Sequence, residues 1–227
     1  MIGQSLALAT LLAFPGVPGA DPLEAALNRF LGKDPDTFLA NLEQSRPTAI
    51  TTEMKTRVLA SLPVEGEVRS SNTTARRKLA AVAPVLRLHG RDAIYEVKVI
   101  DVPQAFFGLH ARTVVLISET ALSLLDAEEV QAHVAHEVGH EYVWSQYQLA
   151  RHRRESLLLQ ELELFCDGVA IVTLRQTGVD PARLISGHEK IIRYNREHFG
   201  WADNEDSYPS LTVRKMFASE IMHWLER

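Results

Sequence analysis

Hydrophobic residues recur at helical spacing along most of the chain. After Asp126, the residues Val130, Val134 and Val138 lie four positions apart, which places them on one face of a helix. Asp126 followed by Glu129 is the capping-box pattern of a helix start. Similar patterns predict helices starting at Asp21-Pro22, near 35–45, at 47–62, at 155–176, after Asp180-Pro181 and after Pro209.

Two stretches ahead of the helix at Asp126 have a different pattern. Residues 94–102 alternate and are rich in β-branched side chains, and residues 113–118 form a second run of this kind. Both predict strands. Small and polar residues between Pro63 and Thr74 predict a loop. The expected fold class is therefore α+β, mostly helical, with a small β-sheet beside one long helix.

Composition limits the expected number of domains and the classes of partner. The chain has 227 residues, of which 46% are hydrophobic, and this is enough for one buried core. We expect one domain over residues 21–227, with a helical N-terminal part at 21–90 and the part that carries the chemistry at 91–227. A net charge of -5 gives no sequence-wide signal for nucleic acid.

The first twenty residues resemble a secretory signal peptide. An apolar run from Leu6 to Phe14 is followed by small residues up to Ala20, although no Lys or Arg precedes it. The run is shorter than the ~20 residues that a membrane-spanning helix needs. We expect export to the periplasm or medium, with an N-terminal tether if the segment is not cleaved. A buried or disordered N-terminal segment is the alternative.

The helix that begins at Asp126 contains His136-Glu137-Val138-Gly139-His140. Histidines four residues apart lie about 40° from each other around a helix, so both imidazoles can reach one zinc ion from the same side. Glu137 lies beside them, where its carboxylate can act as a general base without being a ligand. The pattern alone is a moderate signal because it is short.

Two acidic residues on the following predicted helix strengthen this reading. A catalytic zinc site has three protein ligands and one open position, and Glu163 can supply the third ligand. Asp167 lies four residues further on the same face and can accept a hydrogen bond from His136. Their neighbours Leu162, Leu164 and Phe165 are apolar, which favours a buried site over a solvated surface. We therefore predict one zinc ion per chain.

These motifs give the sequence a resemblance to a known family. The run Val114–Ser118, the sequence Ala135–His140 and the Glu-x-x-x-Asp at Glu163 and Asp167 follow the order seen in gluzincin metallopeptidases. This is the family of the CAAX prenyl proteases and the HtpX-type proteases, and the resemblance covers residues 102–214. It implies a zincin-like zinc endopeptidase whose protein or peptide substrate adds as a strand along 113–118.

A third element of that family is only partly present. The family has His-Pro followed five residues later by Arg, whereas this chain has Tyr208-Pro209 and Arg214. The resemblance implies catalytic positions for both residues. The Tyr208 phenol can donate a hydrogen bond to an oxyanion, and Arg214 can supply charge or order the site.

The remaining histidines and the cysteine are not expected to be ligands. His133, one turn before His136, is interpreted as a core or ligand-orienting residue, and Cys166 as a small buried side chain. Ordinary surface or packing roles are expected for His89, His110, His152, His188, His198 and His223.

The sequence therefore predicts a zinc-dependent metalloendopeptidase that uses a zinc-activated water with Glu137 as general base. An aminopeptidase is a rival, although no separate acidic motif for a substrate amine is visible. A non-catalytic, zinc-stabilised binding or chaperone-like module is another. Glu137 argues against that module because a structural zinc site needs no base.

Overall fold

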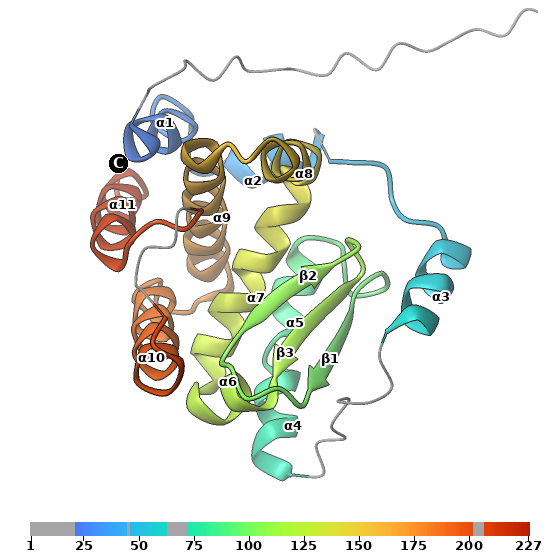
Figure 1. Ribbon diagram of the computed structural model, residues 1–227. Helices are drawn as coiled ribbons and strands as arrows, with labels where there is room; N and C mark the ends of the chain where they lie inside the picture. Colours follow the sequence, from blue (N-terminus) through green and yellow to red (C-terminus); the bar gives the residue numbers. More distant parts are fainter. Residues whose placement is uncertain (1–20, 45, 63–71, 202–206) are drawn as a thin grey trace, which may run out of the picture.

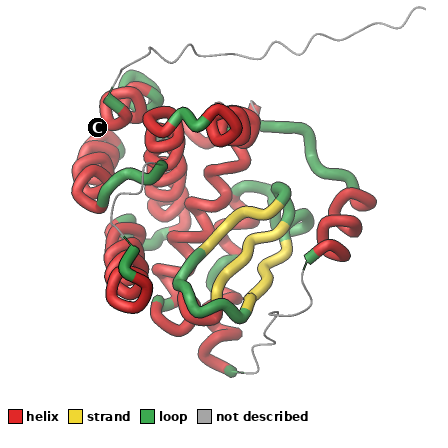
Figure 2. Tube along the Cα trace, in the orientation of Figure 1, coloured by secondary structure: helices red, strands yellow, loops and turns green. Residues whose placement is uncertain are grey.

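The computed structural model describes residues 21–44, 46–62, 72–201 and 207–227. Helices make up most of these ranges, and a small sheet lies on one side of the molecule (Figure 2). The expected α+β, mostly helical fold class is confirmed. The predicted signal peptide lies outside the described residues, as do residues 63–71 of the predicted loop.

The sheet has three strands, two of which were predicted. These are β1 (Glu96–Ile100) and β3 (Val114–Ser118), and β2 (Phe107–His110) is an addition. The strand order is β1-β3-β2, with β1 parallel to β3 and β2 antiparallel to it. β3 is therefore the central strand, and β2 is the edge nearest to α7 (Ala127–Tyr142) (Figure 1).

The turn between β2 and β3 explains why β2 was missed. Its central residues Ala111 and Arg112 have φ of 48° and 57°, as a type I′ turn requires. Asn-Gly is the usual sequence signal for such a turn, and this chain lacks it there. Arg112 is held by the Thr48 carbonyl at 2.8 Å and by Glu141 at 3.4 Å. Tertiary contacts thus support a turn that local preference disfavours.

Two long helices, α7 and α9 (Ser156–Thr177), pack side by side at the centre (Figure 1). The predicted capping box of Asp126 and Glu129 starts α7, and Gly178 in the left-handed conformation ends α9. At their crossing, a Cβ added to Gly139 would lie only 2.9 Å from the Cys166 Cα. Because Gly139 has no side chain, the two helices can approach this closely.

Most of the N-terminal helices pack on the two central helices. α1 (Pro22–Asn28), α2 (Phe38–Gln44) and α5 (Ala83–Leu88) pack on α9, while α4 (Thr73–Ala80) packs on α7. The Phe30 ring sits directly on Gly168, where an added Cβ would come within 2.2 Å. α3 (Thr52–Ser61) buries no side chain and lies beyond β1 (Figure 1).

Four further helices complete the described structure, and they are α6 (Glu119–Leu124), α8 (Trp144–Arg153), α10 (Ala182–Phe199) and α11 (Leu211–Trp224). α10 packs on α7 and α11 packs on α9. Within the described ranges, no helix combines the length and the apolar character needed to cross a bilayer.

Candidate metal centre

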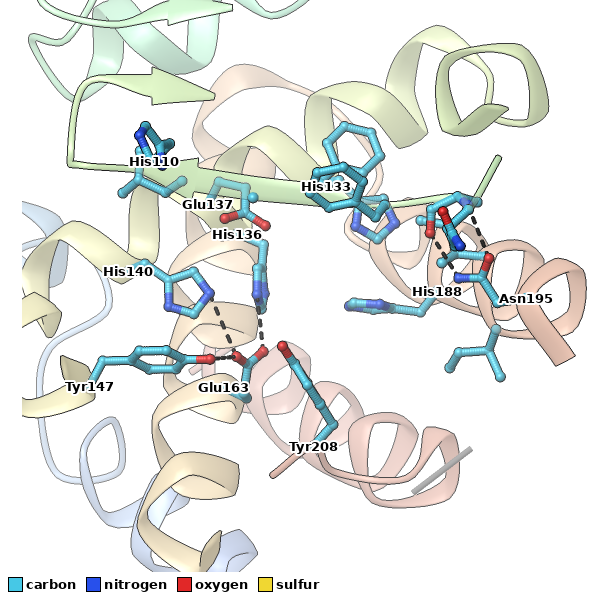
Figure 3. Close-up of a pocket in the computed structure, with 18 of the residues that line it drawn as sticks. His110, His133, His136, Glu137, His140, Tyr147, Glu163, His188, Asn195 and Tyr208 are labelled. Carbon is cyan, nitrogen blue, oxygen red and sulfur yellow. Dashed lines mark hydrogen bonds and ion pairs between the residues drawn. The ribbon is translucent and has the colours of Figure 1, made fainter. Parts of the chain in front are cut away.

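Helix α7 presents His136, Glu137 and His140 from one buried stretch of the chain. All three side chains lie at the floor of a cleft of about 900 Å³ beneath β2 (Figure 3). Their ligand-type atoms lie within 4.8 Å of one another. The four-residue spacing of the histidines thus produces the predicted convergence.

Helix α9 contributes the two predicted acids from the opposite side. His136 Nε2 lies 3.3 Å from Glu163 Oε2, and His140 Nε2 lies 3.7 Å from Glu163 Oε1. The other imidazole nitrogen of His136, Nδ1, donates to Asp167 Oδ1 at 2.7 Å. The arrangement therefore has two imidazole nitrogens facing one carboxylate, with a second carboxylate fixing the ring of His136.

This donor set fits zinc. Two histidine Nε2 atoms and one carboxylate are a known ligand set of catalytic zinc sites, which leave a fourth position for water or substrate. His136 also has the outer hydrogen bond that zinc-binding histidines almost always have. The opening of the cleft onto these atoms provides access for a substrate.

The ionisable groups of the cluster shift one another's pKa values. Burial alone would raise the pKa of Glu163, but the nearby His140, His136 and Arg214 lower it well below its usual range. Burial alone would lower the pKa of His136, but hydrogen bonds to Asp167 and Glu163 raise it to about 10. Glu163 is thus an anion that faces the proton on His136 Nε2. A bound divalent cation would take the place of that proton.

Glu137 has a different environment from Glu163. Burial raises the pKa of Glu137 to about 7, and the backbone N–H of Leu109 on β2, which faces the carboxylate, opposes part of that rise. A carboxylate with a pKa near neutrality can both accept and return a proton, as a general base must.

Arg214 contacts the two acids of α9. Its Nη1 donates to Asp167 Oδ2 at 2.5 Å, and its Nη2 donates to Glu163 Oε2 at 3.3 Å. The side chain is buried and its charge is compensated by both carboxylates. Of the two roles expected for Arg214, ordering the site is the one that these contacts support.

The matched family extends over the core of this site. The model of peptidase family M48 matches residues 69–190, more than half of the chain. The chain belongs to peptidase family M48. The predicted resemblance to the CAAX prenyl and HtpX-type proteases is thereby confirmed, with the match starting earlier and ending earlier than residues 102–214. No curated protein matches the sequence.

The M48 match includes the His136, Glu137 and His140 group together with Glu163 and Asp167, whereas Tyr208 and Arg214 lie beyond it. Tyr208 lines the cleft together with Tyr147. Figure 3 shows its hydroxyl pointing toward Glu163. The phenol therefore faces the same cleft as the candidate metal ligands.

Tyr147 is a functional candidate that the sequence did not reveal. Its hydroxyl donates to Glu163 Oε1 at 2.8 Å, and its ring lies edge-on to His140 with centroids 4.8 Å apart. Tyr147 follows His140 by seven residues, but the chain passes from α7 to α8 between them. Helical spacing therefore could not place it.

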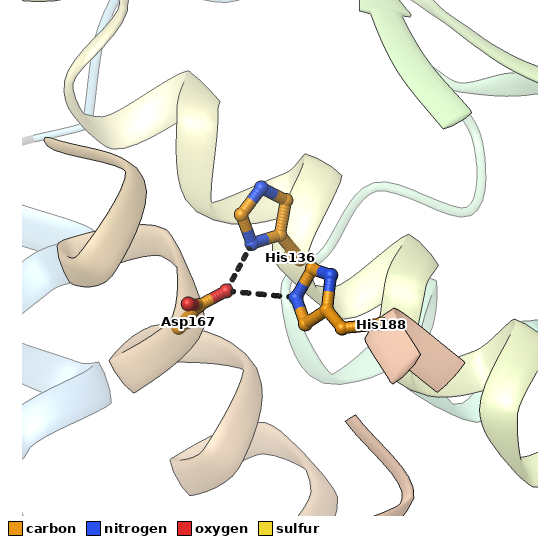
Figure 4. Close-up of side chains that lie close together, drawn as sticks. All are labelled: His136, Asp167 and His188. Atoms are coloured by element: carbon orange, nitrogen blue, oxygen red, sulfur yellow. Dashed lines mark hydrogen bonds and ion pairs between the residues drawn. The ribbon is translucent and has the colours of Figure 1, made fainter. Parts of the chain in front are cut away.

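One histidine prediction is wrong for this M48 chain. His188 was expected to be an ordinary surface or packing residue, yet its Nε2 lies 3.3 Å from Asp167 Oδ1 (Figure 4). It also lines the cleft. Asp167 therefore contacts both His136 and His188. His188 comes from α10, so only packing of α10 on α7 brings it to the site.

His133 fits its predicted core role. It is buried, its ring stacks on Phe107 with centroids 4.9 Å apart, and it lies outside the metal-type clusters of the described residues. Burial lowers the pKa of His133 well below its usual value, so the ring is neutral.

The predicted substrate-binding strand needs correction. β3, which covers the predicted residues 113–118, pairs with β1 on one side and β2 on the other. Both of its edges are therefore occupied, and it cannot accept another strand. β2 is the strand that lines the cleft, so a substrate strand would have to pair there.

Replacing Gly139 with alanine is expected to separate α7 from α9 and weaken the metal site. The added Cβ would meet backbone, which cannot rotate away. We expect this overpacking to lower the free energy of unfolding by about 1–3 kcal/mol. At a helix position without such a clash, the same change raises the free energy of unfolding by about 1 kcal/mol. Chemical denaturation and zinc titration measure the two effects, with Glu128→Ala at an exposed position of α7 as control. Unchanged stability and zinc affinity would contradict the expectation.

Proposed function

We propose that this protein is a zinc-dependent metalloendopeptidase that cleaves polypeptide chains in the cleft beneath β2. The observation that carries the proposal is the convergence of His136 Nε2 and His140 Nε2 on the Glu163 carboxylate, at 3.3 Å and 3.7 Å. M48 membership and a buried Glu137 beside these ligands support it.

His136, His140 and Glu163 would hold the zinc ion. When bound, zinc supplies polarisation of the peptide carbonyl and acidification of a water molecule. Asp167 keeps the His136 ring oriented, and Arg214 and Tyr147 hold the two oxygens of Glu163 from different sides. These contacts fix the ligands before substrate arrives.

Glu137 would take the proton from the attacking water and return it to the leaving amine. Its pKa of about 7 suits both transfers near neutral pH. As the carbonyl oxygen gains negative charge, the Tyr208 phenol on the cleft wall is a candidate hydrogen-bond donor to it.

Substrate is proposed to bind as an extended strand along β2, which forms the roof of the cleft (Figure 3). Backbone pairing with an edge strand gives affinity that is largely independent of sequence. A protein or peptide substrate is therefore expected. We further propose that the chain is exported, with the segment before residue 21 acting as the signal.

Elemental analysis of the purified protein, together with casein hydrolysis, tests this proposal. We expect one zinc per chain and cleavage that a chelator abolishes and added zinc restores. Internal fragments, including cuts in a peptide with a blocked N-terminus, would distinguish an endopeptidase from an aminopeptidase. Zinc without cleavage would favour the non-catalytic module, and no zinc would refute the metal site.

A further inference from the structure

The outer edge of β2 is the surface on which a substrate strand would pair. Phe106 accepts a hydrogen bond from the Ser118 N–H at 3.0 Å, and Gly108 lies opposite Leu116. Because inward and outward backbone groups alternate in an antiparallel pair, Phe107 and Leu109 direct their N–H and C=O groups away from β3. The same alternation continues to Ala105.

The outward groups of Ala105 already have a partner. Its N–H donates to Asn195 Oδ1 at 2.9 Å, and its C=O accepts from Asn195 Nδ2 at 2.8 Å. Asn195 is buried and comes from α10 (Figure 3). One carboxamide thus makes both hydrogen bonds that a neighbouring strand would make to this residue.

At the other end of β2 the outward edge is held differently. The Leu109 N–H faces the Glu137 carboxylate on the helix that carries His136 and His140. Arg112, just after β2, contacts Glu141 at 3.4 Å, and Glu141 directly follows His140. Between these contacts and Asn195, Phe107 is the residue whose outward backbone faces the cleft.

We propose that Asn195 is a stop for the substrate strand. Its carboxamide occupies the pairing position at Ala105, so backbone pairing of a substrate on this side ends at Phe107. Antiparallel pairing, the more stable arrangement, directs the carboxyl side of the scissile bond toward Ala105. Asn195 therefore limits how many residues on the carboxyl side contribute to binding. This inference rests on the proposed function.

A purely structural role for Asn195 makes a different prediction. If the carboxamide only ties α10 to the segment before β2, its loss would reduce stability and lower activity on all peptides by the same factor. A stop instead sets the dependence of activity on peptide length. The dependence of activity on peptide length, and not the overall activity, therefore distinguishes the two roles.

The experiment uses peptides that share one mapped cleavage site and differ in length on its carboxyl side, from one residue to five. For the wild type, kcat/KM is expected to level off within this series, once the substrate residue that pairs with Phe107 is present. For Asn195→Ala it should continue to rise by about fivefold for the next paired residue, the factor typical of one net hydrogen bond. Arg196→Ala, on the exposed face of α10, is the matched control and should follow the wild type.

Several outcomes would overturn the stop. One is a wild-type kcat/KM that rises with every residue added on the carboxyl side. Another is a kcat/KM that levels off at the same peptide length in Asn195→Ala as in the wild type. If the alanine variant does not fold, Asn195→Ser removes the two-point contact with a smaller polar residue. A wild type that cleaves no peptide removes the proposed function together with this inference, whereas the other outcomes leave the proposed function intact.

Discussion

Replacing Glu137 with glutamine is expected to reduce hydrolysis by about 10²- to 10⁴-fold while zinc content stays at one per chain. The range is that of a positioned general base. Glutamine keeps the shape of the side chain, but it cannot take a proton from water. Since Glu137 is not among the three proposed ligands, the metal should remain bound.

The measurement combines kcat/KM on a peptide substrate with elemental analysis of the same preparations. Glu128→Gln is the matched control because it makes the same change on the same helix at an exposed carboxylate. Full activity in the Glu137 variant with zinc bound would show that another group is the base. Loss of zinc together with activity would instead place Glu137 among the ligands.

The second large effect is expected from Glu163→Ala, which should remove most of the bound zinc and with it the activity. Loss of a residue that only orients a ligand typically costs 10- to 100-fold in metal affinity. Loss of a ligand itself should cost at least about 100-fold. The change also removes the α9 partner of Tyr147 and one of the two α9 partners of Arg214, which keeps its contact with Asp167.

Zinc affinity by competition with a chromophoric chelator measures this directly and does not require activity. Glu161→Ala is the control because Glu161 lies on the same helix but pairs with Arg29, away from the cleft. Circular dichroism at each zinc concentration separates metal loss from unfolding. An unchanged zinc affinity in a folded Glu163→Ala protein would rule Glu163 out as a ligand.

Local patterns predicted the parts of the site that lie on single helices. His136 and His140 share a helix, as do Glu163 and Asp167, and 3.6-residue periodicity places each pair on one face. The cap at Asp126 was also visible because capping depends on residues adjacent in sequence. The family resemblance rested on these same short motifs.

Contacts that join distant elements were not predictable in this way. His188 and Asn195 belong to α10, and their partners Asp167 and Ala105 lie on α9 and before β2. The strand β2 was missed because its four residues and its Ala111-Arg112 turn have no strong local signal. The substrate-strand prediction then assigned the cleft edge to β3.

The sequence by itself determined the secondary structure of the two central helices, the candidate metal ligands and the family. These depend on short-range spacing, which the chain carries in its order of residues. The tertiary structure alone decided which strand faces the cleft, how Arg214, Tyr147 and His188 surround the acids, and where Asn195 closes the strand edge. Those features depend on helix packing distances, such as the close approach at Gly139, and on long-range hydrogen bonds that periodicity does not encode.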